Sequence, residues 1–478
     1  MMPGLLDLLP DIALLVLAAL VMGLDLLPRS QGGRWLGLVT AVGLAIILAL
    51  SLYASLVPGP TQLFGSMLRS DALGHGFRLI VLFASMITAL VSMDVPGVGD
   101  RGEYYGLMLV STLGMDLMAA SSDLVMLYLA IETTSIPLYL LSGYFREERR
   151  SVEAGLKYFL FGAAASTTML FGFSWLYGFS GQTSLAGIAK AAATGTLPLA
   201  LWAGSAVLVL VGFGFKVSAV PFHFWAPDVY EGAPTPITAF ISTASKAAGF
   251  AVLLRVMLSV FTPVITPYWG GIIAAMAVAS MTLGNILALA QQNLKRLLAY
   301  SSIAQAGYAL VGLAAHSPLG LAGTIFYLGA YVVTNLAAFV IVIVVSRTVG
   351  SDDLARFGGM SRRSPGLALA LLVSLLSLAG IPPFVGFVAK VFVFAAAVQS
   401  GLVWLAIVGV LNSIVGLYYY LIVLKVVYLS PCADEGKPMP VPVPARWALG
   451  LTIAGILVVG VISGPWFGWA MNAARVLF

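Results

Sequence analysis

The chain has 478 residues, of which 60% are hydrophobic and 9% are charged, and its formal net charge is +5. A soluble globular protein is roughly 45–50% apolar and about 25% charged, so this composition excludes a soluble enzyme, a nucleic-acid-binding protein and a disordered chain. The single cysteine, Cys432, excludes a disulfide framework, an iron–sulfur cluster and a cysteine-ligated zinc site. The three histidines are far apart in the sequence and make a poor metal-binding set. We therefore expect neither a cofactor nor a metal ion in this chain.

Apolar segments separated by glycine, proline and charged residues follow one another along the whole chain. A helix needs about 20 apolar residues to cross a bilayer, and fourteen segments approach or exceed that length. The sequence therefore predicts an all-α polytopic membrane protein with about fourteen transmembrane helices. In chain order the predicted spans are 11–28, 35–57, 76–93, 104–120, 122–144, 154–178, 199–221, 234–260, 269–290, 296–315, 319–346, 365–398, 402–429 and 447–470.

Lysine and arginine are distributed unevenly between the two sides of these spans. The loops that follow odd-numbered spans carry fourteen of them, whereas the loops and tails on the other side carry four. Loops rich in lysine and arginine stay on the cytoplasmic side. We therefore expect a multi-pass protein of the cell (inner or plasma) membrane with both termini on the outer side.

Four ionisable residues lie well inside apolar spans: Glu132 in the fifth, Lys216 in the seventh, Lys246 in the eighth and Lys390 in the twelfth. Each costs about 2.5–3.5 kcal/mol at the centre of a spanning helix. Structural ion pairs are one interpretation, but a single acid cannot pair with three lysines. Desolvation disfavours the charged form of a lysine, so a buried lysine beside a movable carboxylate can bind and release a proton. We therefore interpret the four residues as a proton pathway, with Glu132 pairing across helices with Lys216.

Two other basic residues, Arg255 and Lys425, lie towards the ends of their spans. Long basic side chains in such positions usually extend along the apolar surface and place their charge at the membrane interface. We therefore expect both to reach the interface rather than a buried partner.

Two of the spans that carry a lysine also carry helix-breaking residues. A proline at membrane depth frees backbone groups, which is tolerated only where the helix is buried in protein or lines a wet cavity. The breaking segments hold Pro221 and His223 after Lys216, and Pro382 and Pro383 before Lys390.

The two breaks are five spans apart, and an odd offset inverts one repeat relative to the other in the membrane. We therefore predict two inverted five-helix repeats, each with one broken helix. The expected units are the first three helices (1–103), the first repeat (104–261), the second repeat (262–430) and a final helix (431–478).

The tenth span carries four polar side chains, Ser301, Ser302, Gln305 and Tyr308, at helical spacing. Hydrogen bonding between helices is one interpretation of such a pattern. The other is a hydrated stripe along which protons pass.

Long motifs around the intramembrane charges resemble the antiporter-like subunits of respiratory complex I, and among these the subunit N group. The most specific is FKVSAVPFHFWAPDVYEGAPTPITAFISTASKAAG at 215–249. Three further segments agree with the family: YLAIETTSIPLYLL, NLKRLLAYSSIAQAGY and SLAGIPPFVGFVAKVFVF. The resemblance extends over about 100–460, whereas the first three spans agree only in character.

This resemblance implies proton translocation driven by quinone reduction elsewhere in a complex. It implies that the partners are other membrane subunits, and that NADH, flavin, iron–sulfur clusters and quinone are handled by those subunits. By position, the family's acid falls on Glu132, its broken-helix lysine on Lys216, its bridging lysine on Lys246 and its terminal residue on Lys390. Many relatives have histidine where this chain has Gln305, and glutamine cannot titrate.

Two other functions compete with this interpretation. A subunit of a multisubunit cation/proton antiporter would share the fold, but the motif PDVYEGAPTP and the chain length favour complex I. A passive assembly scaffold would not need to bear the cost of three central lysines and an acid. We expect the three lysines to form one relay, with Lys246 in an unbroken helix between Lys216 and Lys390.

Overall fold

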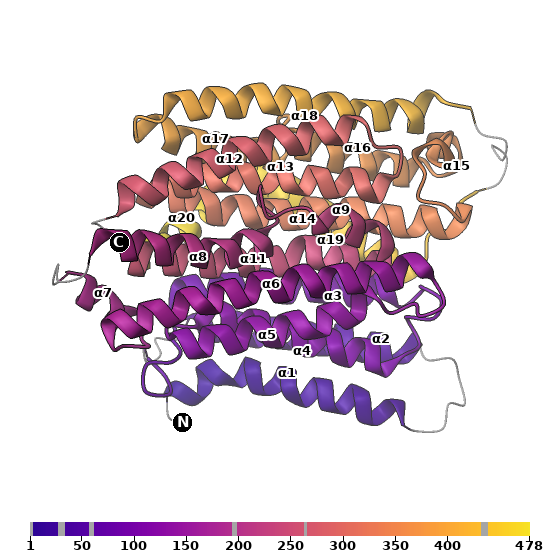
Figure 1. The fold of residues 1–478 in the computed structure, drawn as a ribbon. Coiled ribbons are helices and arrows are strands. Elements are labelled where there is room, and N and C mark those ends of the chain that lie inside the picture. Colours follow the sequence, from indigo (N-terminus) through magenta and orange to yellow (C-terminus); the bar gives the residue numbers. More distant parts are fainter. Residues whose placement is uncertain (1–2, 27–33, 57–61, 194–197, 262–264, 432–437) are drawn as a thin grey trace.

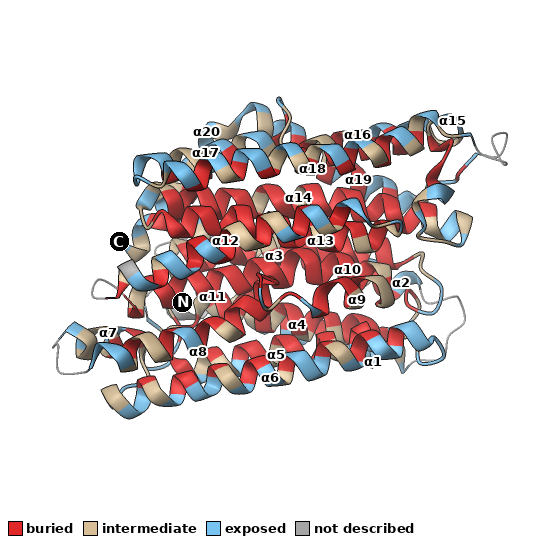
Figure 2. Cartoon of the chain, turned by 45° about the horizontal axis from the view of Figure 1, so that its top comes forward, coloured by how far each residue is buried: buried red, intermediate tan, exposed pale blue. Residues whose placement is uncertain are grey.

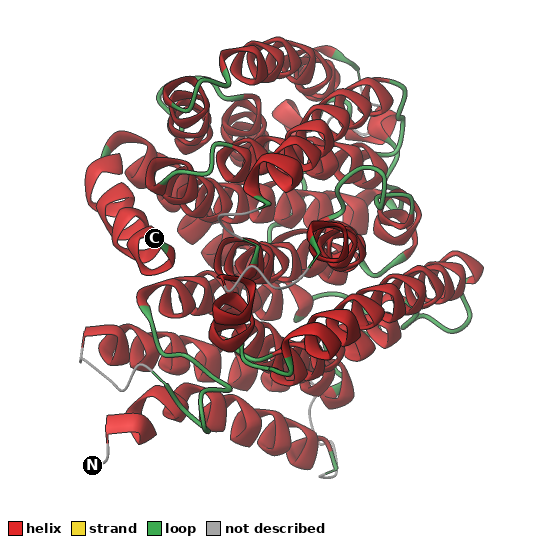
Figure 3. Cartoon of the chain, turned by 60° about the vertical axis from the view of Figure 1, so that its left-hand side comes forward, coloured by secondary structure: helices red, strands yellow, loops and turns green. Residues whose placement is uncertain are grey.

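The computed structural model describes residues 3–26, 34–56, 62–193, 198–261, 265–431 and 438–478. Within these ranges the regular secondary structure is helical and contains no strand (Figure 3). Long helices lie side by side in one bundle, and both termini lie at the same end of it (Figure 1).

The helices of the first half follow the predicted spans closely. They are α1 (Pro3–Asp25), α2 (Arg34–Leu56), α3 (Ala72–Ser92), α4 (Gly102–Ala120), α5 (Leu124–Ser142), α6 (Arg149–Ser180), α7 (Leu185–Ala193), α8 (Leu199–Val217), α9 (Trp225–Gly232), α10 (Thr235–Phe240), the π-helical turn η1 (Ile241–Ser245) and α11 (Lys246–Val260).

The second half repeats this alternation of long and broken helices. Its elements are α12 (Thr266–Leu289), α13 (Leu294–Ala314), α14 (Pro318–Val349), η2 (Leu354–Phe357), α15 (Met360–Arg363), α16 (Pro365–Ala379), α17 (Val385–Gln399), α18 (Val403–Leu429), α19 (Val443–Val461), α20 (Ser463–Ala474) and η3 (Arg475–Leu477).

Each of the fourteen predicted spans corresponds to a helix or to a broken pair. Among the described residues, twelve helical segments are long and apolar enough to cross a membrane, the continuous α10–η1–α11 segment being one of them. The other two crossings are α4, which carries two acidic residues, and the pair α16–α17. The prediction of an all-α polytopic membrane protein is therefore confirmed.

The helices differ sharply in how much of their surface is buried. The α10–η1–α11 segment is buried along its whole length, and α13 and α14 almost so, whereas α1, α6 and α18 expose one apolar face (Figure 2). An apolar face left open in this way suits lipid or another membrane protein. The buried centre of the bundle is where Lys246 and the polar residues of the tenth span lie.

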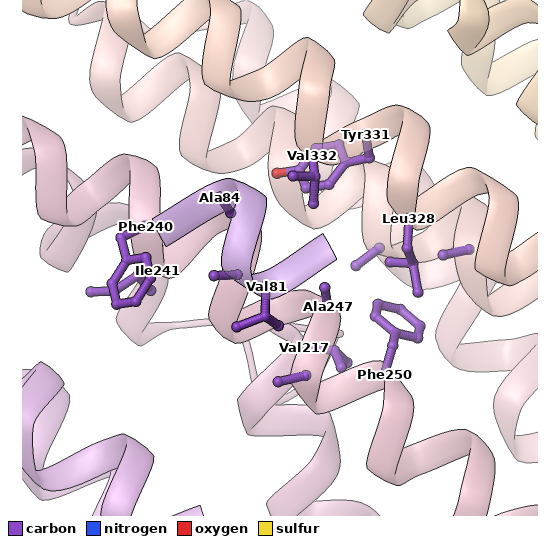
Figure 4. Close-up of a cluster of buried hydrophobic side chains, with 14 of the residues drawn as sticks. Val81, Ala84, Val217, Phe240, Ile241, Ala247, Phe250, Leu328, Tyr331 and Val332 are labelled. Atoms are coloured by element: carbon purple, nitrogen blue, oxygen red, sulfur yellow. The ribbon is translucent and has the colours of Figure 1, made fainter. Parts of the chain in front are cut away.

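Among the first three helices, α3 is the one that packs into this buried centre of the bundle. Its Val81 and Ala84 belong to a buried apolar cluster (Figure 4). The other labelled members come from α8, from α10 to α11, and from α14: Val217, Phe240, Ile241, Ala247, Phe250, Leu328, Tyr331 and Val332.

A buried ion pair also fastens α3 to the centre, and it corrects one expectation. Arg255 of α11 has a buried partner: it is 2% exposed and donates to Asp71 at 2.8 and 2.9 Å. The guanidinium finds a bidentate partner because Asp71 is the N-cap of α3, where its side chain also accepts from the Gly74 amide at 2.8 Å. Burial alone would raise the pKa of Asp71, but the charge and hydrogen bonds of Arg255 outweigh burial and lower it. Lys425, by contrast, is exposed on α18, and its position at the interface stays a prediction.

We predict that Asp71→Ala destabilises the protein by more than about 3 kcal/mol, because breaking a buried ion pair costs about 3–5 kcal/mol and losing an N-cap adds about 1 kcal/mol. Thermal unfolding in detergent measures the loss. Because the pKa of Asp71 is lowered on folding, its contribution is present at neutral pH and disappears as the pH falls through that lowered value.

Asp123→Ala is the matched control, because Asp123 caps α5 through the Val125 amide at 2.9 Å but faces no arginine in the described contacts. It should lose only the capping energy, about 1 kcal/mol. Equal losses in the two variants would mean that the Arg255 pair contributes nothing.

Candidate functional site

The first broken helix brings Lys216 to the last turn of α8. The α-helix stops at Val217, and helical structure resumes at Trp225. Backbone groups that the break leaves without a helical partner form hydrogen bonds within the protein. Trp225 Nε1 donates to the Phe215 carbonyl at 3.2 Å, and the Val220 amide donates to Ser280 Oγ at 2.9 Å. Irregular backbone at membrane depth requires such partners.

The remaining predicted residues of this break, Pro221 and His223, lie in the connection between α8 and α9. His223 is buried and its ring packs against Phe224 with centroids 4.5 Å apart. Its Nδ1 has no hydrogen-bond partner among the described residues. Hydrogen bonding through that atom therefore does not connect His223 to the charged residues.

Lys216 is 6% exposed and donates to Ser135 Oγ of α5 at 2.5 Å. Glu132 lies one turn before Ser135 and accepts a hydrogen bond from Ser166 of α6. The described contacts include no direct Glu132–Lys216 ion pair, and the expected pairing across the two helices stays a prediction. A serine hydroxyl on the acid's own helix occupies the lysine instead, because the half-buried Glu132 is turned towards α6.

Lys246 is 1% exposed and begins α11 directly after the π-helical turn η1. Its helix is continuous, as expected, but it is not a regular α-helix. Single π turns recur at functional sites because they shift the register of the helix that follows. Lys246 Nζ donates to the carbonyl of Ser302 at 2.8 Å and to its hydroxyl at 2.9 Å, which connects α11 to α13.

A glycine allows α11 to approach Lys216 closely. A Cβ placed on Gly249 would lie 3.2 Å from the Cβ of Lys216. Gly249 lies three residues after Lys246, so this close approach of α11 to α8 occurs within one helical turn of that lysine. Val217 of α8 and Ala247 of α11 belong to the buried apolar cluster in this region (Figure 4).

Three residues of α13, at intervals of three, lead from Lys246 towards Lys390. Ser302 binds Lys246, and Tyr308 lies beneath Lys390, whose Nζ is 4.5 Å from the ring centroid. Between them, Gln305 accepts from the Tyr327 hydroxyl and donates to the Leu378 carbonyl at 3.1 Å.

The fourth polar residue of the tenth span faces another helix. Ser301 lies 2.5 Å from the Tyr420 hydroxyl of α18, so its contact fits the alternative interpretation, hydrogen bonding between helices.

The second broken helix holds Lys390 near its gap. α16 ends at Ala379, Pro382 and Pro383 lie in the connection, and α17 begins at Val385. Lys390 is 6% exposed and donates to the Ala379 carbonyl at 2.8 Å. The last carbonyls of a helix have no partner within that helix, so the break supplies the acceptor that holds the lysine.

A small cavity adjoins Lys390 and Gln305. Its volume is about 10 Å³, near the smallest that holds one water molecule. Its lining is rich in hydroxyl groups, among them those of Tyr327, Tyr331, Thr334 and Ser377. The described residues around Lys390 can therefore bind water beside the ammonium group.

Sequence reasoning missed several polar partners. Ser135 could have been found, because it lies one helical turn from Glu132. Tyr327 and Ser166 carried no signal, because tyrosine and serine are common in spanning helices and only the packing brings them to the site. No group of three or more side chains suited to a metal ion occurs among the described residues.

Comparison with known proteins gives one consistent result. Residues 121–416 match the family described as NADH:quinone oxidoreductase/Mrp antiporter, TM. NADH-quinone oxidoreductase subunit N of Moorella thermoacetica is 42% identical over 471 residues, which cover 98% of this chain and 97% of the relative.

Solved structures share the architecture. A chain of respiratory complex I from Thermus thermophilus with bound aureothin superposes with a TM-score of 0.81 at 33% identity, covering 96% of this chain and 99% of that one. A chain of the Mrp complex from Dietzia sp. DQ12-45-1b superposes with a TM-score of 0.84 at 22% identity, covering 99% and 97%, and shares the fold. The chain therefore belongs to the NADH:quinone oxidoreductase/Mrp antiporter transmembrane family.

Proposed function

We propose that this chain is the proton-translocating membrane subunit of an NADH-quinone oxidoreductase (complex I). It couples electron transfer to quinone in other subunits to proton movement across the bilayer. The observation that carries the proposal is the 42% identity to a subunit N over nearly the whole length of both chains. Burial of three lysines beside two helix breaks and a π turn supports it, since such residues are too costly to be incidental.

The proton path in this proposal uses Glu132, Lys216, Lys246 and Lys390. Glu132 controls the charge of Lys216 from α5, with Ser135 between them. The hydrogen bond of Lys216 to Ser135 supports this arrangement, because a small movement of either side chain would exchange the hydroxyl for the carboxylate.

Lys246 then passes charge along α13 towards Lys390. The bonds of Lys246 to Ser302 and the position of Lys390 over Tyr308 support this route. Gln305 cannot carry a proton itself, so water in the adjoining cavity carries it past this residue. The two repeats (104–261 and 262–430) are inverted in this scheme, and each break opens towards one side of the membrane.

The partners in this proposal are other membrane subunits of the complex and the lipid bilayer. Flavin, iron–sulfur clusters, NADH and quinone stay with those other subunits, and no nucleic acid is involved. The chain spans the cell membrane with both termini on the outer side, which places the arginine-rich loops in the cytoplasm.

A subunit of a multisubunit cation/proton antiporter is the second candidate, since a chain of the Mrp complex shares this fold. Purification of the tagged chain from its native membrane distinguishes the two. We predict that it co-purifies with subunits carrying flavin and iron–sulfur clusters, and that the preparation oxidises NADH with quinone. Recovery with only other multi-span subunits and without redox activity would favour the antiporter.

We predict that Glu132→Gln strongly reduces coupled proton transport in membrane vesicles driven by the electron donor, because glutamine cannot bring a negative charge to Lys216. Glu132→Asp keeps the charge and should retain part of the transport. Glu153→Gln is the control, because Glu153 is an exposed acid on the neighbouring α6. Unchanged transport in Glu132→Gln would refute this role.

Lys246→Arg should impair transport nearly as much as Lys246→Ala, while the complex still assembles. In water, arginine releases its proton about 2–3 pKa units less readily than lysine, so its neutral form is at least about 100-fold rarer. Proton uptake per electron pair and subunit content measure the two effects.

The matched control for this pair is Lys425, a lysine in the spanning helix α18 that is exposed. Both Lys425→Arg and Lys425→Ala should leave transport intact. If Lys246→Arg pumped normally, Lys246 would serve only as a fixed positive charge.

A further inference from the structure

A second set of charges, buried or partly buried, lies away from the four residues of the proposed path. It forms where the first turns of α1 and α3 meet the last turns of α4 and α11, at the end of the bundle that carries the N-terminus (Figure 1). Its charged and titratable members are Asp7, Asp11, Arg69, Asp71, His75, Arg78, Asp116 and Arg255.

The three arginines of this cluster already form ion pairs and hydrogen bonds. Arg78 Nε reaches the two oxygens of Asp116 at 2.8 and 2.7 Å, its Nη2 reaches Asp11 Oδ2 at 2.8 Å, and its Nη1 reaches the main-chain carbonyl of Asp7 at 3.0 Å.

Asp71 occupies the other two guanidinium groups. It pairs with Arg255 at 2.8 Å and with Arg69 at 3.1 Å. The side chain of Asp7 therefore has no arginine partner within ion-pair distance among the described residues.

Two carboxylate oxygens of the cluster lack a partner. Asp7 is 3% exposed, and neither its Oδ2 nor the Oδ1 of Asp11 has a hydrogen-bond partner among the described residues. His75 Nε2 lies 3.9 Å from Asp7 Oδ1 but is engaged with Ser70 Oγ at 3.2 Å.

Asp7 and Asp11 line the same small cavity. Residues four apart on a helix lie on one face, so Asp7 and Asp11 project side by side. Both line a cavity of about 20 Å³ beside Arg78 and His75, enough for one water molecule. The two carboxylate groups whose oxygens lack a hydrogen-bond partner therefore line a cavity in which a small ligand can bind.

The net charge of the aspartates and arginines in the cluster indicates which ligand the cavity suits. Among the described members of the cluster, four aspartates face three arginines, so with a neutral His75 they carry one surplus negative charge. An unpaired buried charge is strongly unfavourable, and so is a buried oxygen without a donor. Binding of a single proton removes both unfavourable features. It neutralises the surplus negative charge, and it supplies the O–H donor that the unpaired carboxylate oxygens lack.

We propose that Asp7 and Asp11 together form a proton-binding site that holds one exchangeable proton. The proton comes from water at the N-terminal end of the bundle, one carboxylate becomes a carboxylic acid, and no other bond forms or breaks. The site is separate from Glu132, Lys216, Lys246 and Lys390, and it does not depend on the proposed function. It gives the first three helices a proton site of their own.

Infrared difference spectroscopy of the assembled complex during a pH titration tests this site. The carbonyl stretch of a carboxylic acid marks the bound proton and is absent from a carboxylate. In the wild type one buried acid should keep this band at neutral pH and lose it in alkali. Asp7→Asn and Asp11→Asn, which preserve size, should each remove that component.

Asp353→Asn is the control, because Asp353 is exposed near η2, and it should leave the buried component unchanged. The proposal is overturned if the wild type shows no such component, or if the component survives in either variant. A component that responds to Na⁺ at constant pH would overturn it too, since the site would then bind a metal cation. The wild-type titration decides the question even if a variant fails to assemble.

Discussion

The cost of a charge in the hydrocarbon core governs this structure. Each of the three central lysines lies at or next to a local departure from α-helical geometry: Lys216 before the gap after α8, Lys246 directly after η1, and Lys390 near the gap before α17. Lys246 and Lys390 donate to main-chain carbonyls on other helices, and that of Ala379 is freed by a helix end. The break between α16 and α17 therefore supplies part of the solvation that water would otherwise give to Lys390.

Burial and polarity are concentrated along the same axis. α10–α11, α13 and α14 are the most buried helices, and they carry or line most of the polar contacts, whereas the outer helices expose apolar faces (Figure 2). Valine, phenylalanine and leucine side chains from α3, α8, α10–α11 and α14 pack together in this buried centre (Figure 4). Such packing keeps bulk water out, so any proton that moves must use the few hydroxyl groups and small cavities that remain.

Much of this could be read from the sequence, because hydropathy and rare charges are local properties. The spans, the four intramembrane charges and the two proline breaks need no knowledge of packing. The features that the sequence did not reveal depend on contacts between residues that are distant along the chain. The buried partner of Arg255 carries no local signal, because Asp71 lies 184 residues away along the chain. Likewise, the insertion of Ser135 between Glu132 and Lys216 follows from side-chain orientation, and the π turn before Lys246 has no sequence signature that we recognise.

We propose that polar groups and water connect the three lysines across the middle of the bundle. An electron cryo-microscopy map of the assembled complex, at a resolution that shows ordered water, tests it most directly. We predict water density beside Gln305 and Lys390, in the cavity lined by Tyr327 and Tyr331, and also between Lys216 and Lys246. A dry, fully packed interior at both places, with each lysine enclosed separately, would contradict it.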